Sequence, residues 1–382
     1  MTSLSSRPLW LPTAVVFLVN GAVFGVWATQ IPFVKERLAL DPAVLGILLL
    51  VLGGGAVSAM LASGYLIHRF GTALLVRVSG ALFCVLLPFV ALMPDVLSLG
   101  LLVLLFGASG GSMDVAMNAH AAEVERGLGR PAMSSFHGMW SVGGLAGAAL
   151  GSLLLGVVSP PVQALACGLA LGAVLAVAQS GLGRGDRARE EPRHGSLRPD
   201  GTALLIGGLA ALCFASEGSV LDWSSLYLRV ELGAATALSG AAFAAFSGTM
   251  ALGRFLGDRL RRRFGAALVV RAGALLAVAG LIAGPLSGSA IAATAGFALT
   301  GLGLSNIVPV LISAAGTSPK PEVAIATVAT LGYAGLLAAP PLLGLVAHAT
   351  SLSGAFVLVA GLCLVVSLGS VRARPADARF QQ

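Results

Sequence analysis

The chain has 382 residues, of which 57% are hydrophobic and 10% are charged, and its mean hydropathy is +0.94. A soluble globular domain carries about 25% charged residues, so this composition excludes an ordinary water-exposed surface. A net charge of +7 would suit nucleic-acid binding in a soluble protein, but the placement of the basic residues explains it better as membrane topology. We therefore expect an integral membrane protein whose partner is the lipid bilayer and not a nucleic acid.

Apolar runs of about 20 residues, enough to cross a bilayer as a helix, predict the membrane spans. The twelve predicted spans are 9–33, 43–67, 73–93, 96–121, 134–158, 161–180, 202–228, 237–257, 266–286, 289–312, 323–346 and 351–370. The first run is too long for a signal peptide and lacks a small-residue cleavage site, so we keep it as a helix. The predicted fold class is an all-α membrane protein with two six-helix bundles.

The basic residues are distributed unevenly over the predicted connections. Three of the 23 basic residues, Lys35, Arg37 and Arg229, fall in odd-numbered connections, and the others fall in even-numbered connections or near the chain ends. By the positive-inside rule, both termini are predicted to lie in the cytoplasm.

A polar stretch at residues 181–201 follows the sixth span and is rich in Gly, Pro and charged residues. It predicts a flexible cytosolic linker between an N-terminal bundle, residues 1–180, and a C-terminal bundle, residues 202–371, with a cytosolic tail at 372–382. The four cysteines lie singly in apolar runs without metal-ligand spacing, so we interpret them as small buried hydrophobic residues. We expect no metal site, no cofactor and no catalytic residue.

An internal repeat relates the two predicted bundles. Residues 69–77 read RFGTALLVR and residues 263–271 read RFGAALVVR, with seven of nine positions identical at an offset of 194. Such a repeat is typical of transporters built from two six-helix halves.

These features resemble the major facilitator superfamily of transporters. The family's loop signature after the second helix of each half is Gly-x-x-x-Asp-Arg-x-Gly; here His68 takes the place of the first Asp, while Asp258 keeps the acid in the second half. The resemblance implies that each loop is a gating latch whose carboxylate lies near a helix amino end. The implied gating residues are Gly64, His68, Arg69, Gly71, Arg254, Asp258 and Arg259. The alternative for Asp258 is a plain i,i+4 pair with Arg254.

A narrower resemblance involves two helices. Residues 112–119, SMDVAMNA, are similar to a stretch of fucose-permease-type sugar:proton symporters, with Asp114 and Asn118 at its Glu and Asn. Residues 216–228 resemble the seventh helix of YbjJ-like bacterial inner-membrane proteins. The resemblance implies a multi-pass protein of the bacterial cytoplasmic membrane.

Polar residues inside the spans are the candidate site, because an ionisable group there costs about 2.5–3.5 kcal/mol. Asp114 is the hypothetical proton-coupling carboxylate, and Asn118 shares its helix face. The residues predicted to bind substrate or couple its transport are Asp114, Asn118, Glu217, Asp222, Asn20, Trp27, Gln30, His137, Trp140, Trp223 and Asn306. The alternative is that they hydrogen-bond between helices and take no part in transport.

The predicted function is secondary transport of a small polar solute by a monomer. Because no Lys or Arg is expected in the middle of a span, neutral or cationic substrates are favoured, and the sugar-symporter resemblance makes a monosaccharide carried with protons the lead. The alternatives are a proton-coupled exporter of a small metabolite or toxic compound, a sensor with the same fold, and an intramembrane enzyme with Ser109 as nucleophile.

Overall fold

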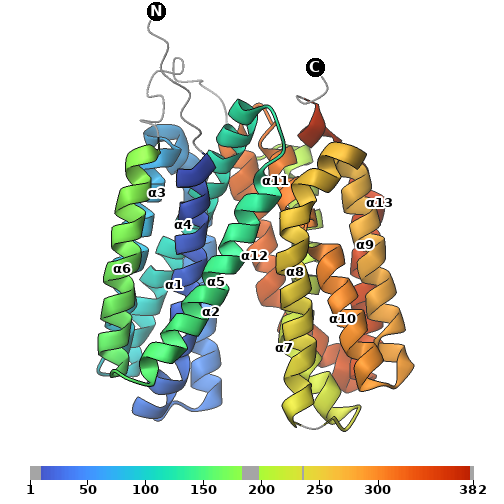
Figure 1. Ribbon diagram of the computed structural model, residues 1–382, viewed down its shortest axis with the longest axis horizontal. Helices are drawn as coiled ribbons and strands as arrows, with labels where there is room; N and C mark the ends of the chain where they lie inside the picture. The colour runs from blue at the N-terminus through green and yellow to red at the C-terminus, as the bar shows by residue number, and fades with distance from the viewer. Residues whose placement is uncertain (1–9, 183–197, 235, 379–382) are drawn as a thin grey trace, which may run out of the picture. The chain divides into compact units, whose positions relative to one another are not determined.

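The computed structural model describes residues 10–182, 198–234 and 236–378, and this part of the chain is helical without a β-strand. The α-helices are α1 (Trp10–Arg37), α2 (Pro42–Phe70), α3 (Thr72–Leu86), α4 (Val96–Leu128), α5 (Met133–Leu155), α6 (Pro160–Gly181), α7 (Gly201–Val230), α8 (Thr236–Phe264), α9 (Ala266–Ala283), α10 (Ala290–Leu304), α11 (Ile307–Ala315), α12 (Pro321–Ala349) and α13 (Leu352–Gly369), as Figure 1 shows. Short 3-10 helices follow three of them: η1 (Leu87–Ala91), η2 (Pro285–Ser287) and η3 (Ser370–Asp377).

The predicted all-α membrane fold is confirmed. In the described chain, 11 helical segments are long and apolar enough to cross a membrane. The twelfth span is α8, which has 29 residues and carries three arginines in its last turn. Most of the predicted linker 181–201, together with Arg7 and Arg379, lies outside the described residues.

Several helices continue past the predicted ends of their spans. α8 reaches Phe264 where the apolar run ends near residue 257, and α4 reaches Leu128 where the run ends near residue 121. Hydropathy detects the lipid-exposed part of a helix, whereas backbone hydrogen bonding continues into its charged final turns. Arg254 is therefore ten residues inside a helix and not at its end.

The predicted span 289–312 is interrupted. α10 ends at Leu304, α11 begins at Ile307, and Ser305 and Asn306 lie between them. Pro309 has no backbone N–H and its ring excludes the carbonyl four residues earlier, which is that of Ser305. The interruption is stabilised by the Asn306 side chain, whose Nδ2 donates to the carbonyl oxygen of Gly253 on α8 at 2.9 Å.

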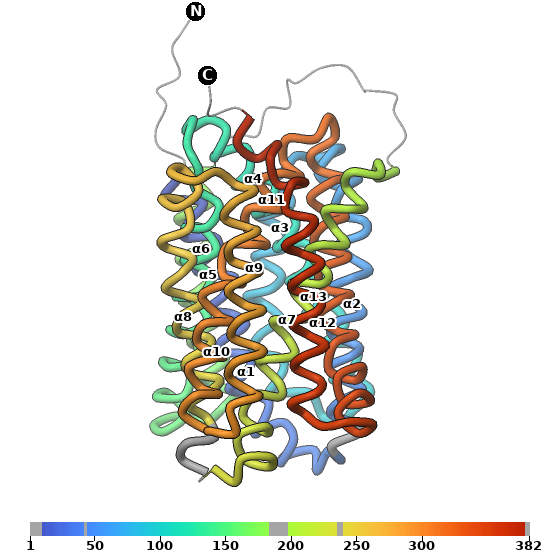
Figure 2. Tube along the Cα trace, turned by 90° about the vertical axis from the view of Figure 1, so that its right-hand side faces the viewer, coloured from blue at the N-terminus to red at the C-terminus, as the bar shows by residue number. Residues whose placement is uncertain are grey.

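The chain divides into two compact units by its internal contacts. Unit 1 comprises residues 1–128 and 139–198, and unit 2 comprises residues 129–138 and 199–382. In unit 1, α4 packs against α1, α2 and α3, and α6 packs against α1 and α3. In unit 2, α7 packs on α12 and α13, while α9 lies between α10 and α13 (Figure 2).

The internal repeat is visible in backbone geometry. Gly71, which precedes α3, has φ of 83° and ψ of 158°, and Gly265, which precedes α9, has φ of 81° and ψ of 158°. Residues other than glycine rarely adopt this backbone conformation, so both halves of the repeat need glycine at this position.

Glycine also sets the distance between helices at repeated positions. A Cβ atom on Gly107 of α4 would lie 2.0 Å from the carbonyl oxygen of Leu52 on α2, and one on Gly301 of α10 would lie 2.3 Å from that of Phe246 on α8. The second pair follows the first at the repeat offset of 194 for both of its residues. Each unit therefore contains the same backbone-to-backbone contact between two of its own helices, which small residues make possible in membranes.

We expect Gly107→Val to lower the melting temperature of the purified protein, because the added side chain overlaps a backbone carbonyl and overpacking costs about 1–3 kcal/mol. Gly54→Val is the matched control, since a Cβ on Gly54 meets nothing within 4 Å. Equal melting temperatures for the two variants would contradict the close contact between α2 and α4.

Candidate functional site

Asp114 and Asn118 share one face of α4. The Asn118 side chain donates from Nδ2 to the backbone carbonyl oxygen of Asp114 at 2.9 Å, and Asn118 is buried. The Asp114 side chain is half-buried, and no hydrogen bond or ion pair joins its carboxylate to another described residue. The Asp114 carboxylate is therefore not engaged by the described scaffold.

The face of α4 that carries Asp114 differs from its lipid-exposed face. The exposed leucines near the start of α4 are Leu97, Leu101, Leu104 and Leu105. At about 100° per residue, Asp114 falls roughly 125° from the centre of that leucine face. It follows Gly107 and Gly111, which contact Leu52 and Ala56 of α2. The half-buried carboxylate is thus directed away from the lipid-exposed side.

Asn20 and Trp140 are brought together by the contact between α1 and α5. Trp140 donates from Nε1 to Oδ1 of Asn20 at 2.8 Å. The approach is close because a Cβ on Gly21 would lie 2.1 Å from the Trp140 carbonyl oxygen, and one on Gly143 would lie 2.0 Å from that of Leu18. Nδ2 of Asn20 is buried with no hydrogen-bond partner among the described residues.

Trp27 and Gln30 lie further along α1 in different surroundings. Trp27 packs on Phe106 with 5.3 Å between ring centroids and lines a small apolar cavity with Leu45, Leu48 and Leu99. Gln30 donates from Nε2 to Oε1 of Gln163 and to the carbonyl oxygen of Pro160 at the start of α6. Its amide group therefore joins α1 to α6.

Sequence reasoning missed Gln163, which is fully buried in the first turn of α6. Its Nε2 donates to Oγ1 of Thr29 and to the carbonyl oxygen of Gly151, so it joins α6 to α1 and α5. The available signal was an amide side chain just inside an apolar run. Gln163 lies at the third position of the predicted span 161–180 and was not among the residues selected.

In unit 2, Glu217 of α7 forms an ion pair with Arg254 of α8. Oε1 of Glu217 lies 3.7 Å from the guanidinium, and 13% and 9% of the two side chains are exposed. Arg254 lies near the end of the predicted span 237–257 and ten residues before the end of α8, and its side chain is buried. His137 in the first turns of α5 lies near the Arg254 guanidinium. The pair satisfies both charges, as burial requires.

Asp222 and Trp223 lie one to two turns beyond Glu217 on α7. Asp222 is exposed, whereas the Trp223 ring packs against Gly344 of α12, where a Cβ would lie 3.2 Å from the ring. Nε1 of Trp223 is buried without a partner among the described residues. The two neighbours therefore occupy different environments.

Asn306 lies at the interruption between α10 and α11. Besides its bond to Gly253, its Oδ1 faces α8 so closely that a Cβ on Gly257 would lie 1.6 Å away. The structure thus places Asn306 in the packing contact between α8 and α10.

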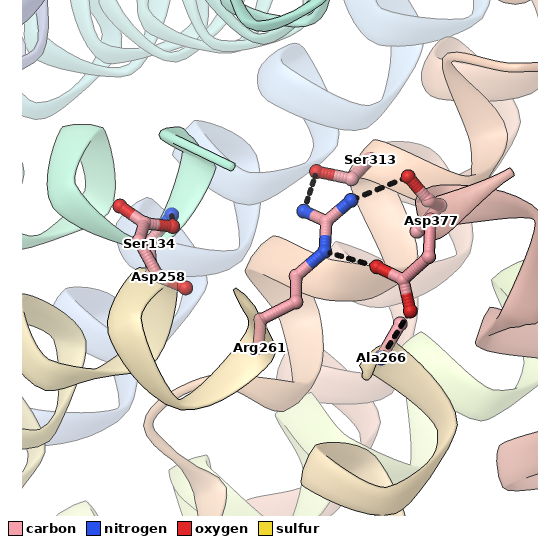
Figure 3. A network of polar contacts seen from close by, with 7 residues as sticks. Ser134, Asp258, Arg261, Ala266, Ser313 and Asp377 are labelled. Atoms are coloured by element: carbon pink, nitrogen blue, oxygen red, sulfur yellow. Dashed lines mark hydrogen bonds and ion pairs between the residues drawn. The ribbon is translucent and has the colours of Figure 1, made fainter. Parts of the chain in front are cut away.

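Asp258 of α8 caps the amino end of α5 (Figure 3). Its Oδ1 accepts from the backbone N–H of Ser134 at 3.1 Å, and its Oδ2 accepts from the N–H of Ser135 at 2.9 Å and from the Ser135 hydroxyl. The first N–H groups of a helix have no intrahelical acceptor and carry partial positive charge, so a carboxylate stabilises them. This contact has the geometry that the family resemblance implied for a latch carboxylate.

The corresponding loop of the first half is built differently. His68 and Arg69 are exposed at the end of α2, and Arg69 stacks over Phe70 at 5.6 Å. After Gly71, Thr72 contacts His120 Nδ1 at 3.4 Å and donates to Glu123 at 3.4 Å, which joins α3 to α4. Gly64 is buried on α2.

Within the described ranges, no group of His, Cys, Asp and Glu side chains could hold a metal ion. Ser109 donates to the carbonyl oxygen of Phe106 on its own helix at 2.8 Å. The polar groups of the site are therefore carboxylates, amides, one buried arginine and indole N–H groups.

Comparisons with known proteins identify the class. The family model of the Major Facilitator Superfamily matches residues 13–330. An uncharacterized MFS-type transporter of Yersinia pestis is 39% identical over 360 residues, covering 93% of each chain. FucP in the outward conformation matches with a TM-score of 0.78 at 14% identity, over 96% of this chain and 99% of that one. The human organic anion transporter MFSD10 matches with a TM-score of 0.74 at 16% identity, over 96% and 99%.

The fold and its polar helices define a multi-pass membrane transporter. The chain belongs to the major facilitator superfamily, whose members move small molecules and are not enzymes.

We expect Asp258→Ala to speed hydrogen–deuterium exchange of the backbone amides at residues 134–136, by about fivefold, because loss of a helix cap costs about 1 kcal/mol. Mass spectrometry of the purified protein measures this. Asp95→Ala is the control, since Asp95 accepts from the N–H of Ser98 and caps α4 in the same way. If exchange at 134–136 is unchanged, Asp258 does not cap α5.

Proposed function

We propose that this protein is a proton-coupled symporter that moves a small neutral polar solute by alternating access, with monosaccharides as the lead class. The observation that carries the proposal is the half-buried Asp114 carboxylate, which no described side chain or backbone group engages. A carboxylate inside a span is stable when it can take up a proton or meet water and substrate, and this exchange couples proton and solute movement.

The likeness to FucP supports the sugar lead. A second structure of FucP, which is a fucose:proton symporter of E. coli, matches with a TM-score of 0.73 at 14% identity. A match at such low identity supports the fold alone, so the substrate class has to be argued from the side chains of this chain. In this chain, Trp140 offers an aromatic face, and Asn20 beside it keeps an unpaired amide N–H among the described residues. Aromatic faces and amide groups together suit a sugar, which has apolar ring faces and hydroxyl edges.

The remaining polar residues receive different roles in this proposal. Asn118 orients the backbone near Asp114, Gln30 and Asn306 hold helices together, and Trp27 belongs to an apolar cluster. Glu217 exchanges protons or substrate in unit 2, where Arg254 is its ion-pair partner. Asp222 and Trp223 lie beyond Glu217 on α7, and Asp222 is exposed. We assign them to the outer end of the proposed site.

The proposed placement is the bacterial cytoplasmic membrane, with a monomeric chain and both termini in the cytoplasm. The segregation of the basic residues supports this orientation. The proposed gating contact is Asp258 on the amino end of α5, since it joins helices through a charge and not through apolar packing. Such a contact can be released and re-formed more readily than the close backbone contacts between helices at glycine.

A second candidate is the transport of an organic anion, including export. The buried guanidinium of Arg254 favours it, because a guanidinium inside the helix bundle is a group that can pair with a carboxylate of the substrate. The name of the structural neighbour MFSD10 points to the same substrate class.

We expect a thermal-shift screen of the detergent-purified protein to identify a sugar or polyol, because a ligand at 100 times its Kd stabilises the native state by about 2.7 kcal/mol. With that solute in proteoliposomes, the wild type should couple solute uptake to proton uptake. Asp114→Asn should abolish the proton movement, measured with an internal pH dye, and keep solute counterflow.

Asp95→Asn is the matched control, since Asp95 is an exposed carboxylate at the start of the same helix. Solute-driven proton uptake that survives in Asp114→Asn would contradict the coupling role of Asp114. Hits confined to organic anions, lost in Arg254→Gln, would favour the second candidate. Absence of any counterflow would favour a sensor.

A further inference from the structure

The described end of the chain is anchored to unit 2 by one buried arginine. Arg261 on α8 donates from Nε to Oδ1 of Asp377 at 3.0 Å, from one terminal nitrogen to Ser313 Oγ at 2.9 Å and from the other to the Ala376 carbonyl oxygen at 2.6 Å (Figure 3). The other oxygen of Asp377 accepts from the N–H of Ala266, the first residue of α9. η3 is therefore held against α9 and α11.

This anchoring places the ends of three neighbouring helices side by side. α9 contacts α8, α13 and η3, so α9 lies between α8 and the segment that follows α13 (Figure 2). Each of these helices carries a stripe of exposed apolar residues that identifies its lipid-facing side. The clearest members are Leu252 and Leu256 on α8, Leu268 and Leu275 on α9, and Leu364 and Leu368 on α13.

The stripes on α8 and α13 are followed by exposed arginine, and the stripe on α9 contains one. On α8, Arg259 follows Leu256 by three residues, and Arg263 follows Arg259 by four, so both continue the stripe. On α9, Arg271 lies between Leu268 and Leu275, and after α13, Arg372 follows Leu368 by four residues. Residues three or four apart share one face of an α-helix, so Arg259, Arg263 and Arg271 lie on the lipid-facing side of their helices. Arg372 lies in η3, directly after the apolar stripe of α13.

The charge of this surface is uniform. Along the second half of α8, α9, α13 and η3, all of which the structure describes, the exposed charged residues are Arg259, Arg262, Arg263, Arg271, Arg372 and Arg374. The two carboxylates there are engaged: Asp258 is buried on α5, and Asp377 is bound to Arg261. Pairing by a nearby carboxylate therefore does not neutralise the lipid-facing arginines.

We propose that this end of unit 2 is a binding site for the headgroup of an anionic phospholipid. Guanidinium groups bind phosphate oxygens through paired hydrogen bonds, and basic clusters at the ends of membrane helices attract acidic headgroups. The acyl chains lie along the leucine stripes, and the phosphate meets the arginines where the stripes end. Arg261 and Asp377 complete the site by holding Arg372 beside α9.

Native mass spectrometry of the delipidated protein tests this, with dioleoyl phosphatidylglycerol and dioleoyl phosphatidylcholine as probes. The wild type should bind phosphatidylglycerol more tightly than phosphatidylcholine. In Arg263→Gln/Arg372→Gln, binding of phosphatidylglycerol should weaken by roughly 25-fold, about fivefold for each arginine, with binding of phosphatidylcholine unchanged.

Arg130→Gln/Arg229→Gln is the matched control, since it removes two exposed arginines that lie outside the stripes. It should keep the preference for phosphatidylglycerol. Equal affinity of the wild type for the two lipids would overturn the proposal, and so would an equal loss in the control, which would indicate an effect of net charge alone.

Discussion

Close approach of helix backbones at glycine is the contact on which the placement of the polar residues depends. In a membrane, helix association gains little from the hydrophobic effect, so small residues that permit tight van der Waals contact determine which helices meet. Gly107 and Gly111 bring α4 onto α2, and Asp114 follows one turn later. The direction of the carboxylate is thus a consequence of the glycines before it. Gly21 and Gly143 have the same effect for Asn20 and Trp140.

The fold followed from the sequence because its main determinants are local. Apolar runs of bilayer length gave the spans, the uneven basic residues supported their number, and the repeat at residues 69–77 and 263–271 related the two halves. Helix ends did not follow, since a helix continues past its apolar part on backbone hydrogen bonds. The interruption at Asn306 was also not predicted, because it depends on Pro309 and on the carbonyl group of a residue on another helix.

The candidate site was predicted less completely, and the reason is physical. Residue type and depth indicate that a polar group needs a partner, but they do not say whether that partner is protein or substrate. Gln30 forms a hydrogen bond with Gln163, and Glu217 forms an ion pair with Arg254. Both contacts join segments that are distant in the sequence. Asp114 remained unengaged by the described residues. Its local sequence marked it as the coupling carboxylate through the symporter resemblance, but it could not show that the scaffold leaves the carboxylate without a partner. The ion pair between Arg261 and Asp377 could not be predicted either, because the two residues are far apart in the sequence.

The interruption between α10 and α11 divides one span into two pieces with different neighbours. α10 packs mainly on α8 and α9, whereas α11 packs on α7, α9, α12 and η3. Two residues, Ser305 and Asn306, are all that connect them. A change of angle between the pieces therefore requires new dihedral angles at two positions and no broken helical ladder. Arg261 on α8 donates to Ser313 on α11, so the angle between the two pieces is held by this contact as well as by the Asn306 side chain.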